Sequence, residues 1–310
     1  MFRASGMPDE IASGPGHTIW FTEFTGNAVG EITPQGTVKT FAVGSDGANG
    51  PTGIVAGPLG EMWFSCGLCI AGITTTGAVS VNSYGGFDYG ATGYQDIAAM
   101  AGQIYFVADF GSGSSGWQLD TENPVTGAQT AVAALPAGTT ADQLSAYGGY
   151  VWLSDNGGVE SGRVIGPSLL RISPGGQERS FRLTRAQLGA TFALAGGSAW
   201  LPETVTLAAR GCPAAARTLV RLDPVTGRRK LYRIPLPAPS GHVLYCPRAL
   251  QVAADARGDV WFAGGDQLVG ERTRAGSYRY WRTPYGATEG MAVDGSTAYV
   301  IVGSEIVALR

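Results

Sequence analysis

Polar and charged side chains recur at regular intervals along this 310-residue chain, each just before a short apolar segment. A second set of acidic residues comes directly after aromatic segments. Carboxylates gathered around one opening can bind a divalent cation, or a ligand with an amine or Arg group, through hard oxygen ligands. The alternative is that these groups solvate a water-filled channel and cap strand ends. The candidates are Asp9, Thr52, Gln95, Asp142, Arg248 and Glu289 in the first set, and Glu23, Asp109, Asp155 and Glu203 in the second.

Histidine is scarce in this sequence, which limits general acid–base chemistry at neutral pH. His17 lies in the turn Gly14-Pro15-Gly16-His17-Thr18, and His242 lies in a Pro-rich segment, 235–247. A single His is a moderate base and needs an orienting partner. We interpret both as surface residues, although the segment that carries His242 can fold toward the opening.

Four cysteines occupy two loop settings. Cys66 and Cys69 flank Gly67-Leu68, whereas Cys212 and Cys246 lie in two long insertions. Disulfides in an exported protein, free thiols, a Cys-x-x-Cys redox pair and a four-thiolate zinc site are the alternatives. The redox motif normally opens a helix, which the sequence does not predict here. We therefore favour disulfides, with a Cys212–Cys246 bridge as a second pairing between neighbouring loops.

An aromatic residue followed by an apolar one recurs seven times, and it identifies the elements that must position these side chains. The aromatic anchors are Trp20, Trp63, Tyr105, Trp152, Trp200, Trp261 and Tyr299, at intervals of 43, 42, 47, 48, 61 and 38 residues. A period of about 40–50 residues with an aromatic in a short strand is typical of a propeller blade. The sequence therefore predicts an all-β fold, a seven-bladed β-propeller.

Each repeat carries the pattern of a four-stranded antiparallel meander. Apolar segments such as 53–56 precede the anchors, and turn sequences such as Ile32-Thr33-Pro34-Gln35-Gly36 follow them. Pro and Gly supply the backbone angles that close such turns. The seventh repeat ends after its third strand, so we expect Phe2–Ser5 to pair with Ile306–Leu309 and close the ring. A ring of repeats is one array, so we expect one domain over residues 1–310.

Composition argues against two classes of partner. The formal net charge is −3, and the only basic run, Arg228-Arg229-Lys230, follows a hairpin turn, so we expect no nucleic-acid groove. Residues 62–87 carry no charge but are interrupted by Gly67, Gly72 and Gly77 and by several Ser and Thr residues, so we expect no membrane span. The sequence opens without the pattern of a signal peptide. We expect a monomer that is secreted or displayed at the cell surface after removal of a leader, with a cytoplasmic location as the alternative.

The repeat units resemble those of the virginiamycin B lyase (streptogramin B lyase) family, a group of seven-bladed propellers with NHL-like repeats. The resemblance is carried by Pro51-Thr52-Gly53-Ile54-Val55-Ala56-Gly57-Pro58-Leu59-Gly60-Glu61-Met62-Trp63-Phe64, and by Ile19-Trp20-Phe21-Thr22-Glu23 with the segment from Gly26 to Pro34. It is clearest in the first two repeats, fair in the sixth and weak in the third to fifth. The same unit occurs in wider groups of propellers.

The resemblance implies a lyase that opens a cyclic depsipeptide by elimination, with a catalytic His, an assisting acidic residue and a bound Mg²⁺; Ca²⁺ is the alternative metal. The family's histidines precede the first strands of the last two blades. Arg248 and Glu289 occupy those positions, and the acidic position falls near Gly303. Arg cannot act as a base at neutral pH. The catalytic residues are therefore unknown.

Three functions remain open. The first is a scaffold that binds a small molecule or a protein, at the central mouth or through the long loops of the fifth and sixth blades, 202–217 and 235–247. The second is a lyase or hydrolase of the virginiamycin B lyase type with rearranged catalytic groups. The third is a structural module at the cell surface. A shared fold does not by itself confer an activity, so we favour the first.

Overall fold

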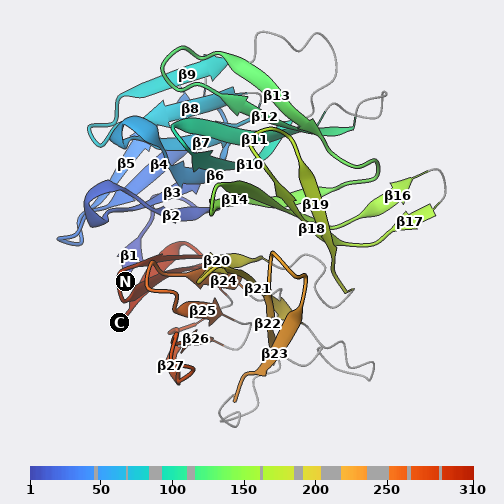
Figure 1. Cartoon of the computed structure of the whole chain (residues 1–310). Coiled ribbons are helices and arrows are strands. Elements are labelled where there is room, and N and C mark those ends of the chain that lie inside the picture. The colour runs from blue at the N-terminus through green and yellow to red at the C-terminus, as the bar shows by residue number, and fades with distance from the viewer. Residues whose placement is uncertain are drawn as a thin grey trace. The chain divides into compact units, whose positions relative to one another are not determined.

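Short strands joined by tight turns make up almost all of the chain in the computed structural model (Figure 1). The structure describes residues 1–44, 48–67, 69–83, 93–109, 116–160, 163–184, 191–203, 218–235, 251–263, 267–285 and 288–310. Seven antiparallel sheets of four strands form the blades of a seven-bladed β-propeller, as predicted. The chain divides into two compact units, 2–183 with the first four inner strands and 184–310 (with Met1) with the other three.

The unit 2–183 holds blades 1 to 4, each a meander whose strands follow one another in the sheet. Blade 1 contains β2 (Ile11–Ser13), β3 (Ile19–Glu23), β4 (Ala28–Ile32) and β5 (Val38–Ala42). Blade 2 contains β6 (Pro51–Ala56), β7 (Met62–Cys66), β8 (Cys69–Ile73) and β9 (Val79–Ser83). Blade 3 contains β10 (Gly93–Met100), β11 (Gln103–Asp109), β12 (Trp117–Glu122) and β13 (Gln129–Ala134). Blade 4 contains β14 (Ala141–Tyr147), β15 (Tyr150–Asp155), β18 (Ser168–Ile172) and β19 (Glu178–Arg182).

Two smaller features decorate this unit. The 3₁₀ turns η1 (Pro15–His17) and η3 (Pro58–Gly60) link the first and second strands of blades 1 and 2. A separate hairpin, β16 (Gly158–Glu160) and β17 (Arg163–Ile165), is inserted between β15 and β18 and projects from blade 4 (Figure 1).

The unit 184–310 holds the remaining inner strands. Blade 5 contains β20 (Ala193–Ala195), β21 (Ser198–Glu203), β22 (Thr218–Leu222) and β23 (Arg229–Arg233). Blade 6 contains β24 (Gln251–Ala254), β25 (Val260–Ala263), β26 (Leu268–Arg272) and β27 (Tyr278–Arg282). Blade 7 contains β28 (Gly290–Asp294), β29 (Thr297–Val302) and β30 (Glu305–Leu309), and its outer strand is β1 (Phe2–Arg3). The predicted pairing of the N-terminal strand with the last blade is confirmed.

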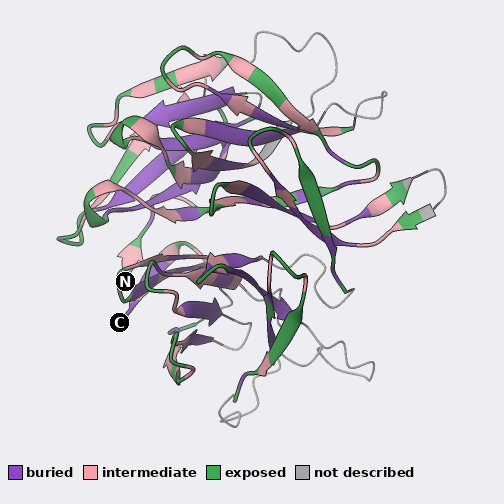
Figure 2. Ribbon diagram, in the orientation of Figure 1, coloured by how far each residue is buried: buried purple, intermediate pink, exposed green. Residues whose placement is uncertain are grey.

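The recurring aromatic–apolar pair is explained by how the blades pack. Successive residues of a strand point to opposite faces of its sheet. Trp20 accordingly packs with Ile54 and Phe64 of the following blade, and Trp63 packs with Phe106 of the blade after that. Figure 2 shows the middle strands of each blade as buried and the outer strands as largely exposed or intermediate. The pair thus forms the apolar layer between neighbouring blades.

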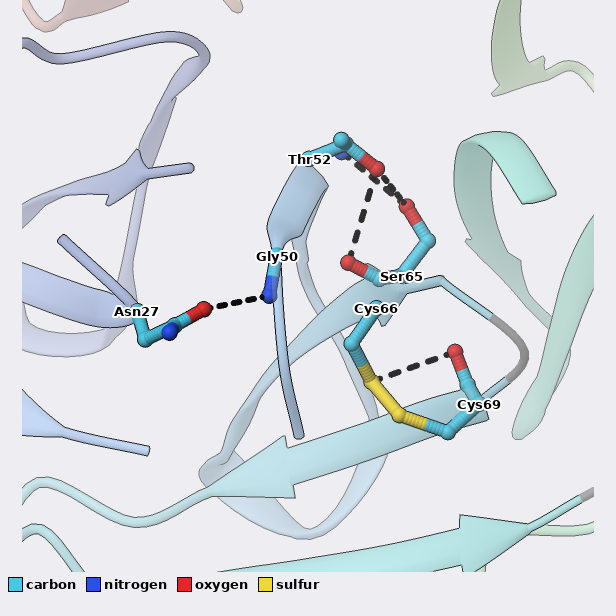
Figure 3. Close-up of a disulfide and its surroundings, with 7 residues drawn as sticks. Asn27, Gly50, Thr52, Ser65, Cys66 and Cys69 are labelled. Carbon is cyan, nitrogen blue, oxygen red and sulfur yellow. Dashed lines mark hydrogen bonds between the residues drawn. A yellow bond between two sulfur atoms is a disulfide. The ribbon is translucent and has the colours of Figure 1, made fainter. Parts of the chain in front are cut away.

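The turn between β7 and β8 is closed by a disulfide between Cys66 and Cys69, whose Cα atoms lie 4.9 Å apart (Figure 3). This confirms the prediction of a disulfide for that pair. The two residues are also register partners in the hairpin. Cys212 and Cys246 lie outside the described residues. No helix in the described part of the chain has the length and apolar character needed to cross a membrane.

Candidate functional site

Carboxylates gather where the inner strands of blades 1, 3 and 4 begin. Asp9 and Glu10 come just before β2, Asp96 lies in β10, and Asp142 is the second residue of β14. The pKa of Glu10 is raised well above its usual value, first by burial and then by the negative charges of Asp96, Asp9 and Asp142. Like charges raise one another's pKa only when they are close together. We call these four residues the inner-strand carboxylates.

The hydrogen bonds made at the starts of the inner strands explain why a carboxylate is held at position 96. The inner strands β6, β10 and β14 each have an irregular register near their start. In blades 1, 2 and 4, a hydroxyl from the second strand accepts a hydrogen bond from a backbone N–H of the inner strand. These bonds are Glu10 N to Thr22 Oγ1 (3.1 Å), Gly53 N to Ser65 Oγ (3.0 Å) and Gln143 N to Ser154 Oγ (2.9 Å). Blade 3 has Val107 at the corresponding position, and so offers no hydroxyl.

Asp96 supplies the acceptor that Val107 cannot. Its carboxylate accepts the backbone N–H of Ile97 at 2.7 Å and that of Leu144, in blade 4, at 2.6 Å. Gly53 of blade 2 makes room for it, since a Cβ on that residue would lie 2.6 Å from Asp96 Oδ1. Asp96 therefore bonds the starts of β10 and β14 and lies close against Gly53 of β6.

Asp96 changes its charge near neutral pH. Burial raises its pKa to about 7; the hydrogen bonds from Leu144 and Ile97 oppose this shift, and the charge of Asp142 adds to it. Burial also raises the pKa of Asp9. Among the residues that the structure describes, no Lys or Arg forms an ion pair with an inner-strand carboxylate.

Two of the candidates that follow aromatic strands hold the local fold together. Glu23 is buried, and its carboxylate accepts hydrogen bonds from Ser5 Oγ (2.6 Å) and Gly6 N (2.9 Å). Asp155 is also buried, and it accepts three bonds, from Thr140 N, Gly157 N and Ser168 Oγ. Their oxygen atoms are thus already engaged by the protein.

The other candidates are less close to this cluster or fall outside it. Thr52 bonds Ser65 Oγ at 2.8 Å, and its carbonyl accepts Thr22 Oγ1 (Figure 3). Glu203 ends β21 and is half-buried, and Glu289 is exposed just before β28. The side chains of Gln95 and Asp109, and the whole of Arg248 and His242, lie outside the described residues. The involvement of these candidates in a ligand site stays a prediction.

His17 lies at the opposite end of β2 from Glu10, because η1 follows that strand and Glu10 precedes it. It is exposed and has a positive φ of 62°. His17 therefore lies away from the inner-strand carboxylates and cannot act as a base on a ligand bound there. Within the described ranges, no group of three or more His, Cys, Asp or Glu residues has the arrangement of a metal site.

Two members of the cluster, Glu10 and Asp96, were not among the sequence candidates. Each directly follows a residue that was, Asp9 and Gln95. The irregular register of β10 between Tyr94 and Ile97 decides which of two neighbouring residues reaches the cluster. The one available signal was that Asp96 is the charged residue in an otherwise uncharged strand.

The fold and its blades define the class of this protein, the seven-bladed β-propellers. Neither a protein-family model nor a curated protein matches the sequence. Among solved structures, the chain is similar to streptogramin B lyase, with a TM-score of 0.71 and 18% identity, covering 100% of this chain and 94% of that one. It is also similar to virginiamycin B lyase from Staphylococcus aureus, with a TM-score of 0.71 and 17% identity, covering 99% and 96%. The resemblance in the repeats is thus confirmed as a likeness of fold.

A third similar structure is the extracellular domain of a one-component system from B. thetaiotaomicron. Its TM-score is 0.66 at 11% identity, and the match covers 98% of this chain and 40% of that one. This likeness, too, is one of fold.

Proposed function

We propose that this propeller is a binding protein that takes a cationic group, an amine or a guanidinium, at the inner-strand carboxylates. The observation that carries the proposal is the closeness of Glu10, Asp96 and Asp142: the charges of Asp96 and Asp142 raise the pKa of Glu10, and the charge of Asp142 adds to the raised pKa of Asp96. Unpaired carboxylates that repel one another are costly, and a bound cation removes that cost. Concave sites with convergent polar groups are the usual places for ligands.

The same carboxylates set a pH dependence for binding. A cation favours the ionised form of Asp96, whose pKa is about 7, so binding releases a proton at pH 6 and little at pH 8. Affinity for a cation should therefore be higher at pH 8. A divalent ion is the less favoured form of the ligand: carboxylate oxygens suit Mg²⁺ and Ca²⁺, but the described carboxylates are not arranged as a metal site.

Isothermal titration calorimetry with agmatine, Mg²⁺ and Ca²⁺ at pH 6 and pH 8 tests this function. We expect at least one probe to bind saturably, with an affinity about tenfold higher at pH 8 than at pH 6. Asp142→Asn should weaken binding about tenfold, since it removes one charge from the cluster. Glu178→Gln is the matched control, because Glu178 lies in the outer strand β19 of the same unit. Equal weakening by the two variants, or no binding of any probe, would contradict the proposal.

A lyase is the second candidate function, and two observations favour it. The fold is similar to that of streptogramin B lyase. Elimination requires a base that is partly ionised near neutral pH, and Asp96 has a pKa of about 7. Asp96 is then the residue that accepts the proton, in place of the His that the resemblance implied.

Quinupristin is the probe for a lyase, since virginiamycin B lyase from Staphylococcus aureus was solved with this compound in a catalytically inactive form. Liquid chromatography with mass spectrometry distinguishes the reactions. A shifted peak of unchanged mass indicates elimination, and a product heavier by one water indicates hydrolysis. Loss of either product in Asp96→Asn would support Asp96 as the base. An untouched antibiotic would leave the binding function alone.

We further propose that the protein is exported. The disulfide and the extracellular location of a similar domain support this. Non-reducing mass spectrometry of the protein from its native source would test it. Free thiols at Cys66 and Cys69 would contradict export, because disulfides persist mainly in oxidising compartments.

A further inference from the structure

The sequence around β22 and β23 carries an unusual concentration of positive charge. Residues 204–254 contain eight Arg or Lys residues and one acidic residue, Asp223, in a chain whose formal net charge is −3. Three cations surround one tyrosine, Tyr232. They are Arg221 of β22, Lys230 of β23 and Arg272 of β26. Like charges this close require compensation.

The aromatic rings under these cations fix their positions. The Arg272 guanidinium lies 4.2 Å from the centroid of the Tyr232 ring and 5.2 Å from that of Trp200. Lys230 Nζ lies 5.0 Å from the Tyr232 ring centroid, and the Arg221 guanidinium lies 5.9 Å from that of Trp200. Ser198 Oγ accepts the Arg221 Nε–H at 2.8 Å. Aromatic rings attract cations through their faces, but they do not neutralise charge.

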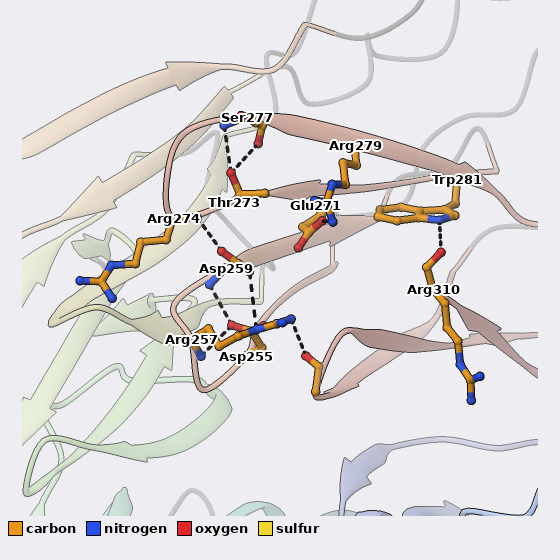
Figure 4. A network of polar contacts seen from close by, with 11 residues as sticks. Asp255, Arg257, Asp259, Glu271, Thr273, Arg274, Ser277, Arg279, Trp281 and Arg310 are labelled. Carbon is orange, nitrogen blue, oxygen red and sulfur yellow. Dashed lines mark hydrogen bonds and ion pairs between the residues drawn. The ribbon is translucent and has the colours of Figure 1, made fainter.

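Comparison with other blades of the same chain shows what is missing. The residue that pairs with the aromatic anchor on the third strand is Glu31 in blade 1 and Glu271 in blade 6. On the fourth strand, Lys39 pairs with Glu31 at 2.8 Å. Arg279 pairs with Glu271 at 3.5 Å (Figure 4). Blade 5 has Arg221 and Lys230 at the two positions, and blade 4 has Arg171 and Arg179, so in both blades a cation stands where blades 1 and 6 have a carboxylate.

No described residue supplies the missing negative charge. In the part of the chain that the structure describes, no carboxylate forms an ion pair with Arg221, Lys230 or Arg272. Segments 204–217 and 236–250 contain no Asp or Glu, so they offer no carboxylate either. The Nε–H of Arg272 is buried and has no hydrogen-bond acceptor. Burial of an unsatisfied charged donor costs more than an ordinary unsatisfied group, and it points to an absent acceptor.

Tyr232 reports the same local field. Burial raises its pKa, but hydrogen bonding from Arg221 and Lys230, with the charges of Lys230 and Arg272, outweighs burial and lowers the pKa overall. The phenolic oxygen is thus the group that the cations now share. Asp223 also feels the charge of Arg221, but its Oδ1 is engaged by the backbone N–H groups of its own turn.

We propose that Arg221, Lys230 and Arg272 form a binding site for a tetrahedral oxyanion, the phosphate or sulfate group of a ligand. Three cations suit a dianion, and guanidinium groups match the geometry of phosphate and sulfate oxygens. The site lies on the third and fourth strands of blade 5 and the third strand of blade 6, and it shares no residue with the inner-strand carboxylates. It does not depend on the function proposed above.

Calorimetric titration with inorganic phosphate and, separately, inorganic sulfate at pH 8 and constant ionic strength tests this site. We expect one saturable site for at least one of the two anions, and the anion that binds more tightly identifies the ester class of the ligand. Arg221→Glu rebuilds the Glu–Lys pair of blade 1 and should fold normally, but should weaken binding about 100-fold, tenfold for the lost cation and tenfold for the added anion. Lys230→Gln should weaken it about tenfold.

Arg228→Glu is the matched control, since it makes the same change of charge in the turn before β23. Arg228 is exposed and outside the set that surrounds Tyr232. We expect this variant to change binding less than about threefold at constant ionic strength. Weakening by Arg228→Glu equal to that by Arg221→Glu would show a diffuse charge effect and overturn the site. So would the absence of saturable binding of both anions by the wild-type protein.

Discussion

The substitution Asp96→Asn tests how the inner-strand carboxylates are charged. An amide cannot lose a proton, so the variant holds residue 96 in its neutral form at every pH. Its oxygen can accept the N–H of Ile97 or of Leu144, as the protonated carboxyl does. The two proteins should therefore be alike at low pH, where Asp96 is protonated, and should differ where it is ionised.

The magnitude follows from the pKa of Asp96, which rises from 3.8 in an ordinary environment to about 7 in the folded protein. Each unit corresponds to 1.36 kcal/mol, so the shift sets a ceiling of about 4 kcal/mol. Asp96 keeps some accessible surface, which lets water screen its charge, and we expect about half of that, roughly 2 kcal/mol.

The sign is fixed by linkage. Between about pH 4 and pH 7 the folded protein holds a proton on Asp96 that the unfolded chain has released. The free energy of unfolding contributed by this group is therefore greatest below pH 4 and falls as the pH rises to 7 and beyond. Asp96→Asn lacks this loss, so it should be more stable than the wild type at pH 8, relative to their difference at pH 5.

Urea unfolding of both proteins at pH 5, 6, 7 and 8 measures the effect. The difference in the free energy of unfolding should change by roughly 1 kcal/mol from pH 5 to pH 8 in favour of Asp96→Asn, because part of the total is already lost between pH 4 and pH 5. Titration of Glu10 occurs in both proteins and largely cancels in this difference. A difference that stays constant across the range would show that Asp96 is ionised throughout, and the reasoning from burial would then be wrong.

Two further predictions concern the packing of blade 1. Gly30→Ala should destabilise the protein by about 2–3 kcal/mol, because a Cβ there would overlap the Phe21 ring, whereas Gly175→Ala, with its nearest neighbour 3.9 Å away, should be neutral; equal urea midpoints for the two variants would contradict this. Glu23→Ala should cost about 1–3 kcal/mol in thermal or urea unfolding, because it removes the acceptor of Ser5 Oγ–H and a backbone N–H, and an unchanged midpoint would show that the N-terminal segment does not depend on this carboxylate.

The fold could be predicted from the sequence because its signal repeats. Trp20 and Trp63 mark equivalent positions, and repetition turns weak local preferences into one consistent architecture. The pairing of β1 with β30 was predictable for a related reason, since the last repeat lacked a strand and Phe2–Ser5 lacked a blade. Both inferences depend on counting elements and not on side-chain detail.

The sites could not be predicted to the same degree, for two physical reasons. A local irregularity in β10, between Tyr94 and Ile97, brings Asp96 into the cluster. No sequence pattern fixes such a shift in register. The oxyanion site depends on Arg272 crossing from blade 6 to the rings of blade 5, and contacts between repeats are absent from the sequence of either repeat. The run Arg228-Arg229-Lys230 was visible, but only Lys230 belongs to the site.

The two proposed sites share one physical argument, which concerns charge that the protein leaves uncompensated. Elsewhere in the chain, buried carboxylates such as Glu31 and Glu271 are paired with Lys39 and Arg279. Because the same repeat unit provides a paired solution in blades 1 and 6, the unpaired cations of blade 5 are not a requirement of the fold. The inner-strand carboxylates are likewise avoidable, since Thr22 and Ser65 satisfy equivalent strands with neutral hydroxyls. A charge that the architecture does not need, and that its own repeats show how to neutralise, is best explained by a ligand of opposite sign.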